Sequence, residues 1–553
     1  MKIVLPALVL VLGLLLPARA QNLPLQEPDD DLRDLLELID SDSGLLDPAI
    51  RPYLNTQAAS LLQAGPESAS LRVRKEACIY AAALGHGNDS CSRKIRKPNL
   101  RYPPFVFHIR DPEIRAAAGD FKLSVRPVYG QRVLLSGRDF FIQSRGGFSF
   151  QAALGRHVAC YGSLRDNYQR NFVLSQPGWL TREEGGNYKL NEGGRKGGDF
   201  SEMRGGIVLS NRWGSLSLVK DRLQWGVSRY GSNIFSGRTP SFAMITLDIR
   251  PAAWIRLNYF HGWLHSEVID SARSYFTVNG DYRAKFIPKY IAANMLTVKP
   301  IRGISLSAGN SVVYAGIPVQ PAFLIPFFFY KSVDHTISHG IDNQNSQVYA
   351  SLSIRRFSHL HLYANLFVDE FSVKRISDPG RHNFYSTQAG FSLTDLLFEG
   401  WQAGMEWTRS MPLVYKHRVP ELSFESNRYQ LGHYLTDNAV DVRLWLTLRP
   451  MAFISLKTAY NHALKYNDYP YLKGIAVDQY PAFKDKVWSS ESWEFKLAWR
   501  WSYLSDIYAC LEVINTEGYN ADGRTAAENL ERYTSPMYYG NRVLFGFGLN
   551  MGI

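Results

Sequence analysis

Long stretches of this chain alternate apolar and polar residues with a period of two, and this pattern limits the possible folds more than any other feature. The clearest run is Trp493, Phe495, Leu497, Trp499 and Trp501, which alternate with Glu494, Lys496, Ala498 and Arg500. Side chains two residues apart lie on the same face of a strand, so each strand has an apolar, aromatic face and a charged face. The core of a β-sandwich would not accept those charges. A barrel with lipid outside and a polar lumen explains both faces.

The remaining hydrophobic segments agree with a barrel. A membrane helix needs about 20 apolar residues, and the longest internal candidate, Ala322 to Tyr330, is interrupted by Pro326. Aromatic residues reach 13% of the chain. The first residues have the pattern of a secretory signal peptide, with an apolar run that is too short to span a bilayer and predicted cleavage after Ala20. An exported chain of this kind is either a large secreted β protein or an outer-membrane barrel.

A repeated turn motif gives the number of strands. The best copies begin at Arg250-Pro251, Lys299-Pro300 and Arg449-Pro450, looser ones at Asn211-Arg212 and Arg355-Arg356, and weaker turns fall near Gly155, Glu399 and Ser502. The spacing of about fifty residues holds two membrane strands of roughly ten residues, one short turn and one long loop. Eight such turns, with one strand before them (Phe121 to Tyr129) and one after (Val543 to Ile553), predict eighteen strands.

The N-terminal part differs, because its apolar residues follow a helical period. Leu32, Leu35, Leu36 and Ile39 share one helical face, Asn55 or Thr56 suits the start of a second helix, and Leu71 to Leu84 predicts a third. We therefore expect an all-β transmembrane barrel of about 18 antiparallel strands with a small helical N-terminal segment. The predicted division is 1–20 as signal peptide, 21–118 as a helical periplasmic segment against the periplasmic mouth, and 119–553 as the barrel.

The chain has four cysteines, which are too few for a disulfide scaffold. Cys78 and Cys91 are close in sequence and are predicted to form a disulfide in an oxidising compartment. Cys160 and Cys510 are not expected to pair. By alternation Cys160 faces lipid and Cys510 faces the lumen, on strands that are four apart across the seam of the barrel.

Several segments, taken in order, resemble the capsule-assembly Wzi family. They are Trp225-Gly226 with Gly231-Ser232-Asn233, Arg238 and Pro240; Lys289-Tyr290 through Val312-Val313-Tyr314; the aromatic stretch Leu324 to Tyr330; Asp342-Asn343; Val368-Asp369-Glu370; and Leu431-Gly432-His433 with Asn438. The resemblance covers most of residues 205 to 460. One departure is Gly309-Asn310, where relatives tend to have Gly-Glu.

The resemblance implies an eighteen-stranded outer-membrane barrel with helices near its periplasmic end. Its best-understood members act as lectins that hold capsular polysaccharide, and related sequences occur among gliding-motility proteins. The candidate ligand-binding residues are Trp225, Arg229, Tyr230, Arg238, Tyr314, Asp369, Glu370 and His433. Trp225 and Tyr314 also fit an interfacial aromatic girdle, which is the commoner role, and His433 fits a hydrogen-bonded loop residue.

We therefore expect a non-catalytic barrel, monomeric in the outer membrane, with periplasmic ends and extracellular long loops. Its formal net charge of +12 suggests acidic polysaccharide or lipopolysaccharide as partners rather than nucleic acid. The alternatives are a porin or polysaccharide channel and an accessory of gliding or secretion machinery. Asp369-Glu370 could supply a glycosidase carboxylate, but a charged strand end is favoured. No cofactor and no metal site are expected.

Overall fold

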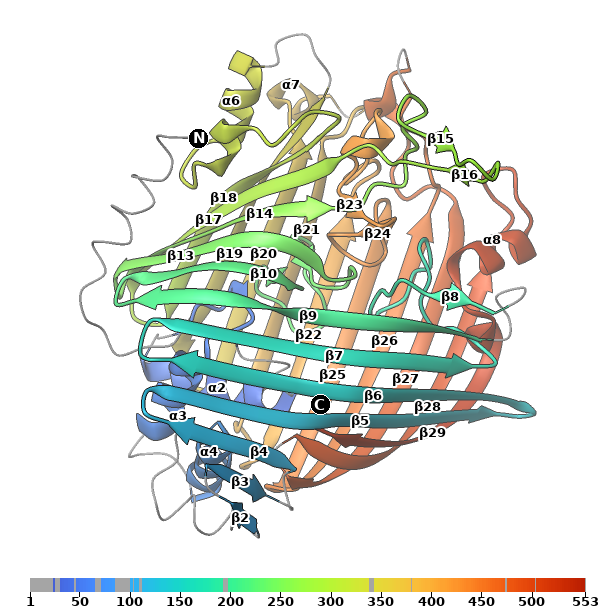
Figure 1. Cartoon of the computed structure of the whole chain (residues 1–553). Coiled ribbons are helices and arrows are strands. Elements are labelled where there is room, and N and C mark those ends of the chain that lie inside the picture. The colour runs from blue at the N-terminus through green and yellow to red at the C-terminus, as the bar shows by residue number, and fades with distance from the viewer. Residues whose placement is uncertain are drawn as a thin grey trace.

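The fold is a closed antiparallel β-barrel of eighteen strands, as predicted (Figure 1). The computed structural model describes residues 23–24, 30–43, 46–64, 71–84, 100–102, 104–108, 112–191, 197–337, 343–378, 380–472, 475–502 and 504–552. The predicted signal peptide and its cleavage point lie outside these residues. The barrel strands are β5 (Phe121–Ser136), β6 (Asp139–Leu154), β7 (Val158–Arg170), β9 (Gly197–Asn211), β10 (Gly214–Asp221), β13 (Phe242–Ala252), β14 (Ile255–Leu264), β17 (Lys289–Ile301), β18 (Ile304–Ala315), β19 (Gln344–Phe357), β20 (Leu360–Glu370), β21 (Phe384–Thr394), β22 (Trp401–Ser410), β25 (Ala439–Met451), β26 (Ile454–Tyr466), β27 (Lys486–Ser502), β28 (Ser505–Gly518) and β29 (Gly540–Met551). The barrel closes where β29 pairs with β5, with Phe547 opposite Val133.

The two faces of each strand match the predicted alternation. On β27, Trp493, Phe495, Leu497 and Trp499 point outward and are exposed, whereas Ser490 and Ser492 point into the lumen and are buried. In a membrane barrel the apolar outer face contacts lipid and the polar inner face lines the lumen. Among the described residues, no helix is long and apolar enough to span a membrane.

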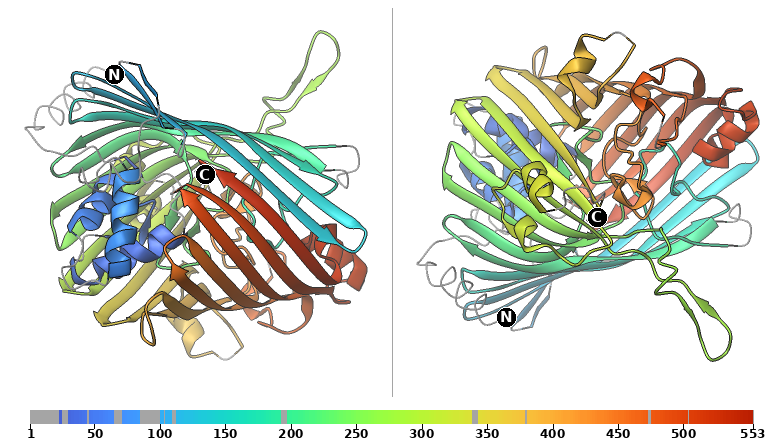
Figure 2. Two further views of the ribbon diagram at one scale, coloured as in Figure 1. Left: turned by 90° about the horizontal axis from the view of Figure 1, so that it is seen from below. Right: turned by 90° about the horizontal axis from the view of Figure 1, so that it is seen from above.

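All eight predicted turns join neighbouring strands at one end of the barrel, which we call the short-turn end. They connect β6 to β7, β9 to β10, β13 to β14, β17 to β18, β19 to β20, β21 to β22, β25 to β26 and β27 to β28. The long connections lie at the opposite, long-loop end. One of them contains the hairpin of β15 (Tyr275–Phe276) and β16 (Tyr282–Arg283), which projects beyond the barrel wall (Figure 2).

The N-terminal segment contains the three predicted helices, α2 (Asp30–Ser43), α3 (Asn55–Ala64) and α4 (Leu71–Ala83). Their apolar faces form one cluster that includes Leu32, Leu36, Leu61 and Tyr80. The helices lie within the barrel at the short-turn end, surrounded by strands (Figure 2). We call α2–α4 the plug.

The description of residues 21–118 as helical is wrong for the last part of that segment. Residues 100–118 form three short strands, β2 (Leu100–Tyr102), β3 (Phe105–His108) and β4 (Glu113–Ala118), and β4 pairs with the first residues of β5. This sheet continues the barrel wall at the short-turn end, beyond the part of β5 that pairs with β29. The sequence analysis did not predict these strands, which have only three, four and six residues.

Cys160 and Cys510 carry free thiols, as predicted. Cys78 is disulfide-bonded, and Cys91 lies outside the described residues, so the Cys78–Cys91 pair stays a prediction. We expect alkylation of the denatured, unreduced protein to modify two thiols, and alkylation after reduction to modify four. Peptide mass spectrometry should assign the first two to Cys160 and Cys510. Alkylation of Cys91 without reductant would contradict the pairing.

Candidate functional site

The plug is joined to the barrel wall by a stripe of acidic residues. Asp31, Asp34, Glu37 and Asp40 recur every third residue along α2 and so lie on one helical face. The ion pairs are Asp31 with Lys457 (3.0 Å) and Arg500 (2.8 Å), Asp34 with Arg449 (2.8 Å) and Arg229, Glu37 with Arg51 (3.2 Å) and Arg355 (3.3 Å), Asp40 with Arg355 (3.7 Å), and Asp47 with Arg256 (4.0 Å). Arg355 and Arg449 belong to the repeated turn motif, and so does Lys299, which donates to the Leu46 carbonyl (2.7 Å).

These pairs keep the buried carboxylates ionised. Burial alone would raise the pKa of Asp31, but Lys457, Arg449 and Arg500 more than offset it, so its pKa lies well below the usual value. Burial also acts to raise the pKa of Glu37, and Arg355 and Arg51 outweigh it in the same way. The wall cations therefore face a charged helix at any ordinary pH.

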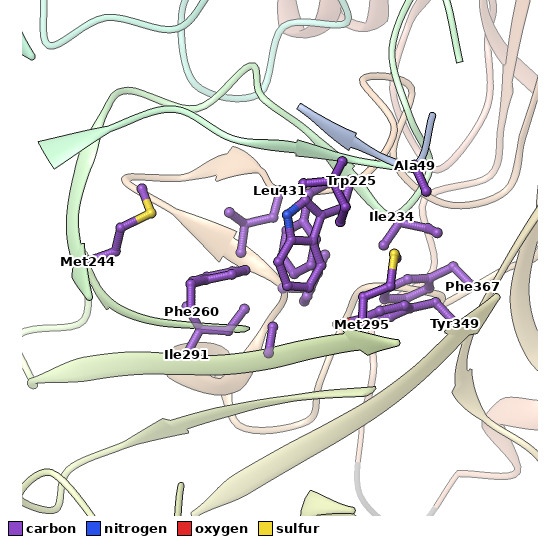
Figure 3. Close-up of a cluster of buried hydrophobic side chains, with 14 of the residues drawn as sticks. Ala49, Trp225, Ile234, Met244, Phe260, Ile291, Met295, Tyr349, Phe367 and Leu431 are labelled. Atoms are coloured by element: carbon purple, nitrogen blue, oxygen red, sulfur yellow. The ribbon is translucent and has the colours of Figure 1, made fainter. Parts of the chain in front are cut away.

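A loop folded into the lumen, residues 222–241, contains four of the predicted site residues. Within it, β11 (Gln224–Trp225) pairs with β12 (Phe235–Ser236) and with β1 (Ile50–Arg51) of the N-terminal segment. Trp225 is 4% exposed and meets Phe235 and Phe260 edge to face, at centroid distances of 5.5 and 5.0 Å (Figure 3). Protein covers the ring, so Trp225 lies neither in a membrane girdle nor on a surface that could stack against a sugar.

Arg229, Tyr230 and Arg238 lie together around one cavity. Arg229 pairs with Asp34 of the plug, and Tyr230 packs against Trp445 with a centroid distance of 5.2 Å. Arg238 donates to the carbonyls of Glu183 (3.1 Å) and Trp179 (3.5 Å). Burial lowers the pKa of Arg238 to about 10, so it still carries its charge at neutral pH.

The other four predicted residues lie apart from this cavity. Tyr314 is fully buried, with its hydroxyl 2.7 Å from His261 Nε2 and its ring against Phe323. His433 is also buried, 3.5 Å from an Asp441 carboxylate oxygen. Both have structural roles, in agreement with the loop role that the sequence favoured for His433.

Asp369 and Glu370 do not form a catalytic pair across one bond. Asp369 accepts from the Tyr415 N–H (2.9 Å), whereas Glu370 meets Arg375 (2.7 Å) and the Tyr471 hydroxyl (3.1 Å). Asp369 lies where the register of β20 against β21 shifts, and each of the two carboxylates already has its own partners in the protein. The favoured interpretation, a charged strand end, agrees with these contacts.

The Gly309-Asn310 departure has a structural role. The Asn310 amide donates to Asn294 Oδ1 (2.8 Å) and accepts from the Tyr330 N–H (2.9 Å), and Asn294 in turn donates to the Phe328 carbonyl (2.8 Å). Asn310 thereby anchors the aromatic stretch of residues 324–330 against the wall. A carboxylate could accept there but could not donate.

The cavity itself, which we call the chamber, has a volume of about 730 Å³. Its cationic lining residues are Arg33, Arg51, Arg145, Arg165, Arg182, Arg204, Arg222, Arg229, Arg238, Arg500 and Lys496, against three carboxylates, Glu184, Asp221 and Asp506. The barrel strands contribute inward-facing arginines. Helix α2 contributes Arg33, β1 contributes Arg51, and the infolded loop contributes Arg222, Arg229 and Arg238. Sequence alternation placed charges in the lumen, but only the fold gathers them around one space.

A strap crosses the lumen above the chamber. Residues 173–184 leave β7, yet Leu180 packs beside Trp488 of β27, which is five strands away across the seam, and beside Tyr533. Arg182 holds this strap to Asp441 (2.8 Å), and Arg132 holds it through Glu183 (2.7 Å). The strap therefore forms a roof over the chamber at the long-loop end.

A second cavity, which we call the rim groove, lies on the outer rim at the long-loop end and has a volume of about 540 Å³. Trp263 and Lys220 come from the outer faces of β14 and β10, and Tyr188, Asn187 and Asn427 come from loops above them. The remaining lining residues are Gln176, Pro177, Gly186, Leu190, Pro240, Ser241, Phe242, Ala243, Leu264, His265 and Ser426. The sequence analysis missed this groove, because it combines five separate segments.

Among the described residues that line the rim groove, none is Asp or Glu. Rings, amides and hydroxyls predominate, and Lys220 and His265 are the basic groups. Nowhere in the described parts of the chain do three or more His, Cys, Asp or Glu side chains gather in a way that could hold a metal ion.

These features define a closed antiparallel transmembrane barrel of the outer-membrane type, plugged by its own N-terminal helices. The fold is similar to that of Escherichia coli Wzi, an outer-membrane protein involved in group 1 capsule assembly and a carbohydrate-binding β-barrel. The TM-score is 0.54 over 97% of this chain and 100% of that one, at 12% identity. The resemblance to Wzi predicted from the sequence is thus confirmed at the level of the fold.

Other solved barrels are less similar. Pseudomonas aeruginosa OccK8 (OprE) gives a TM-score of 0.42 at 8% identity, over 78% of this chain and 97% of that one. OccD3 (OpdP) of the same species gives 0.41 at 9% identity, over 83% and 96%. No family model matches the chain, and no curated protein matches it.

Proposed function

We propose that this barrel binds polysaccharide at its long-loop end and retains it at the cell surface without catalysing a reaction. In this proposal the barrel is a monomer in the outer membrane, with its short turns and both chain ends in the periplasm. Its outer face contacts lipid and lipopolysaccharide. The fold that it shares with a carbohydrate-binding barrel supports a binding role.

The rim groove is the observation that carries the proposal. The faces of Trp263 and Tyr188 suit stacking on sugar rings, and the amides of Asn187 and Asn427 suit hydrogen bonds to hydroxyls. Lys220 would favour acidic sugars, because no carboxylate lines the groove to compete for it. The groove lies where the barrel wall meets the loops, at the height at which a polymer held on the membrane surface would pass.

A porin or polysaccharide channel is the alternative function. The plug and the strap both obstruct the lumen in this structure, which favours a binding protein over an open pore. Lumen obstruction can be tested independently of sugar binding by conductance.

Replacing Trp263 with Ala should weaken polysaccharide retention about threefold to tenfold, because aromatic stacking contributes roughly 0.5–1.5 kcal/mol beyond area burial. The measurement is cell-bound against released polysaccharide, with barrel abundance determined in the same membranes. Trp254→Ala is the matched control, since Trp254 is exposed at the short-turn end. Equal retention by both variants would argue against the rim groove. Normal retention in cells without the protein would remove the function altogether.

A further inference from the structure

We propose that the chamber is a second binding site, separate from the rim groove, which takes a carboxylate- or phosphate-bearing ligand that enters from the short-turn end. This goes beyond surface retention, because it assigns the lumen its own ligand chemistry and its own side of access. It does not depend on the rim groove binding sugar.

The excess of positive charge carries the first half of the inference. Neither Arg145 nor Arg238 forms an ion pair with a carboxylate of the described residues, although both line the chamber. Arg238 is 8% exposed, and among the described residues its side chain donates to backbone carbonyls and lies over the Tyr429 ring. Buried cations are normally paired, so the guanidinium of Arg238 suits an anion that the described residues do not supply. Arg145 is half-buried beside it, and it shares the attraction of Glu184 with Arg222.

The acidic groups nearby do not remove that excess. Arg222 binds both Glu184 (2.5 Å) and Glu202 (2.8 Å), and Arg204 lies 3.8 Å from Asp221. These three acids are therefore engaged by two arginines. A planar guanidinium binds carboxylate and phosphate through paired hydrogen bonds, so such ligands suit the chamber better than a neutral sugar.

The roof and the lower lining residues give the side of access. The strap, held by Arg132 and Arg182, closes the chamber toward the long loops. Toward the other end the lining includes Leu504 and Ser505, at the β27–β28 turn, and Asn550, near the end of β29. The chamber therefore reaches the short-turn end of the lumen, where the plug helices lie (Figure 2).

The plug occupies one side of the lumen and forms a wall of the chamber instead of filling it. Arg33 and Tyr53 of the N-terminal segment line the chamber, opposite Arg145 and Lys496 of the barrel wall. At about 730 Å³ the chamber falls within the usual range for small-molecule sites. It can hold one or a few acidic sugar units or a small phosphate compound.

A cysteine placed in the chamber tests charge preference and sidedness together. Ser163 lines the chamber from β7, and Ser163→Cys can be made in a Cys160→Ser/Cys510→Ser background, which removes the two free thiols. We expect the anionic reagent methanethiosulfonate ethylsulfonate to react at least about tenfold faster than its trimethylammonium analogue, because a cationic cavity concentrates anions. Lys496→Cys is a second variant in case the first does not fold.

Two further cysteines calibrate the direction. Val278→Cys, at the fully exposed tip of the β15–β16 hairpin, marks the long-loop side, and Ser358→Cys, in the β19–β20 turn, marks the short-turn side. Each variant is labelled in intact cells and in permeabilised cells. If the chamber opens to the short-turn side, Ser163→Cys should need permeabilisation to react, as Ser358→Cys does. Reaction in the same condition as Val278→Cys, or no reaction from either side, would overturn the proposed access.

Protection by ligands distinguishes the two sources of negative charge. Oligogalacturonate and tripolyphosphate are added separately during labelling, with neutral maltotriose as the control. Slower labelling with either anion, but not with maltotriose, supports the site and identifies its preferred group. Equal rates for the two thiol reagents and no protection by either anion would refute the site, whereas loss of surface retention in Trp263→Ala would still support the rim groove.

Discussion

Deleting residues 24–84 should raise the single-channel conductance of the barrel about threefold, since barrels of 16 to 18 strands enclose an aqueous channel unless something fills it, and the strap still narrows the lumen. The deletion removes α2–α4 and leaves β2–β4 beside the seam. It also removes the floor beneath the infolded loop. Arg229 loses Asp34, and Trp225 loses its pairing with Ile50.

Planar-bilayer recording of the purified, reconstituted protein measures the effect, and resistance to heat on gels checks that the barrel remains closed. The matched control is deletion of residues 271–284, which shortens the β15–β16 hairpin outside the lumen and should leave the current unchanged. A heat-resistant barrel with unchanged current after loss of the plug would show that α2–α4 do not obstruct conduction.

Neutralising the acidic stripe should release the plug without removing it. In Asp31→Asn/Asp34→Asn/Glu37→Gln, the buried ion pairs of Asp34 with Arg229 and with Arg449 are lost. Breaking one buried ion pair in this way costs about 3–5 kcal/mol. We expect limited proteolysis to cut the triple variant within residues 24–84 at least about a hundredfold faster, while the barrel stays intact.

Asp120→Asn/Asp199→Asn/Asp281→Asn, which removes the same charge from exposed positions, should behave like the parent protein. Equal proteolysis of the two triple variants would contradict the role of the stripe.

The response of the plug to pH should differ from its response to mutation. The ion pairs hold the pKa values of Asp31 and Glu37 below their usual range when the plug is docked. A lowered carboxyl pKa gives stability that is present above the ordinary value, near 4, and is lost only as the pH falls toward the lowered one. The plug should therefore stay docked at pH 4 to 5, and release there would be inconsistent with these pairs.

Much of the wall could be predicted because its signals are local. Alternation over ten residues and a repeated turn at fixed spacing are properties of neighbouring residues, and both carry over directly into β27 and the eight short turns. The three helices were predictable for the same reason, since one apolar face and a starting residue at Asn55 lie within a few turns.

The interior could not be predicted, because it depends on contacts between distant segments. Arg182 meets Asp441 across 259 positions, and no local pattern indicates that the strap crosses the lumen. Trp225 seemed a surface ring for the same reason, although Phe260 and Tyr349 cover it in the folded chain. One signal was available and not used: the acidic residues at every third position of α2 match the basic residues of the turn repeats.

The pairing of α2 with the wall also has a consequence for the order of folding. Asp34 meets Arg449 across 415 positions and Asp31 meets Arg500 across 469, so these contacts close loops nearly as long as the protein. Such contacts form late, because the chain must first be brought together. Helix α2, which is synthesised early, thus docks only after strands that are synthesised almost last. Docking of α2 therefore requires that β25, β26 and β27 have already reached their final places. A docked plug is found only in a barrel whose wall has been assembled as far as β27.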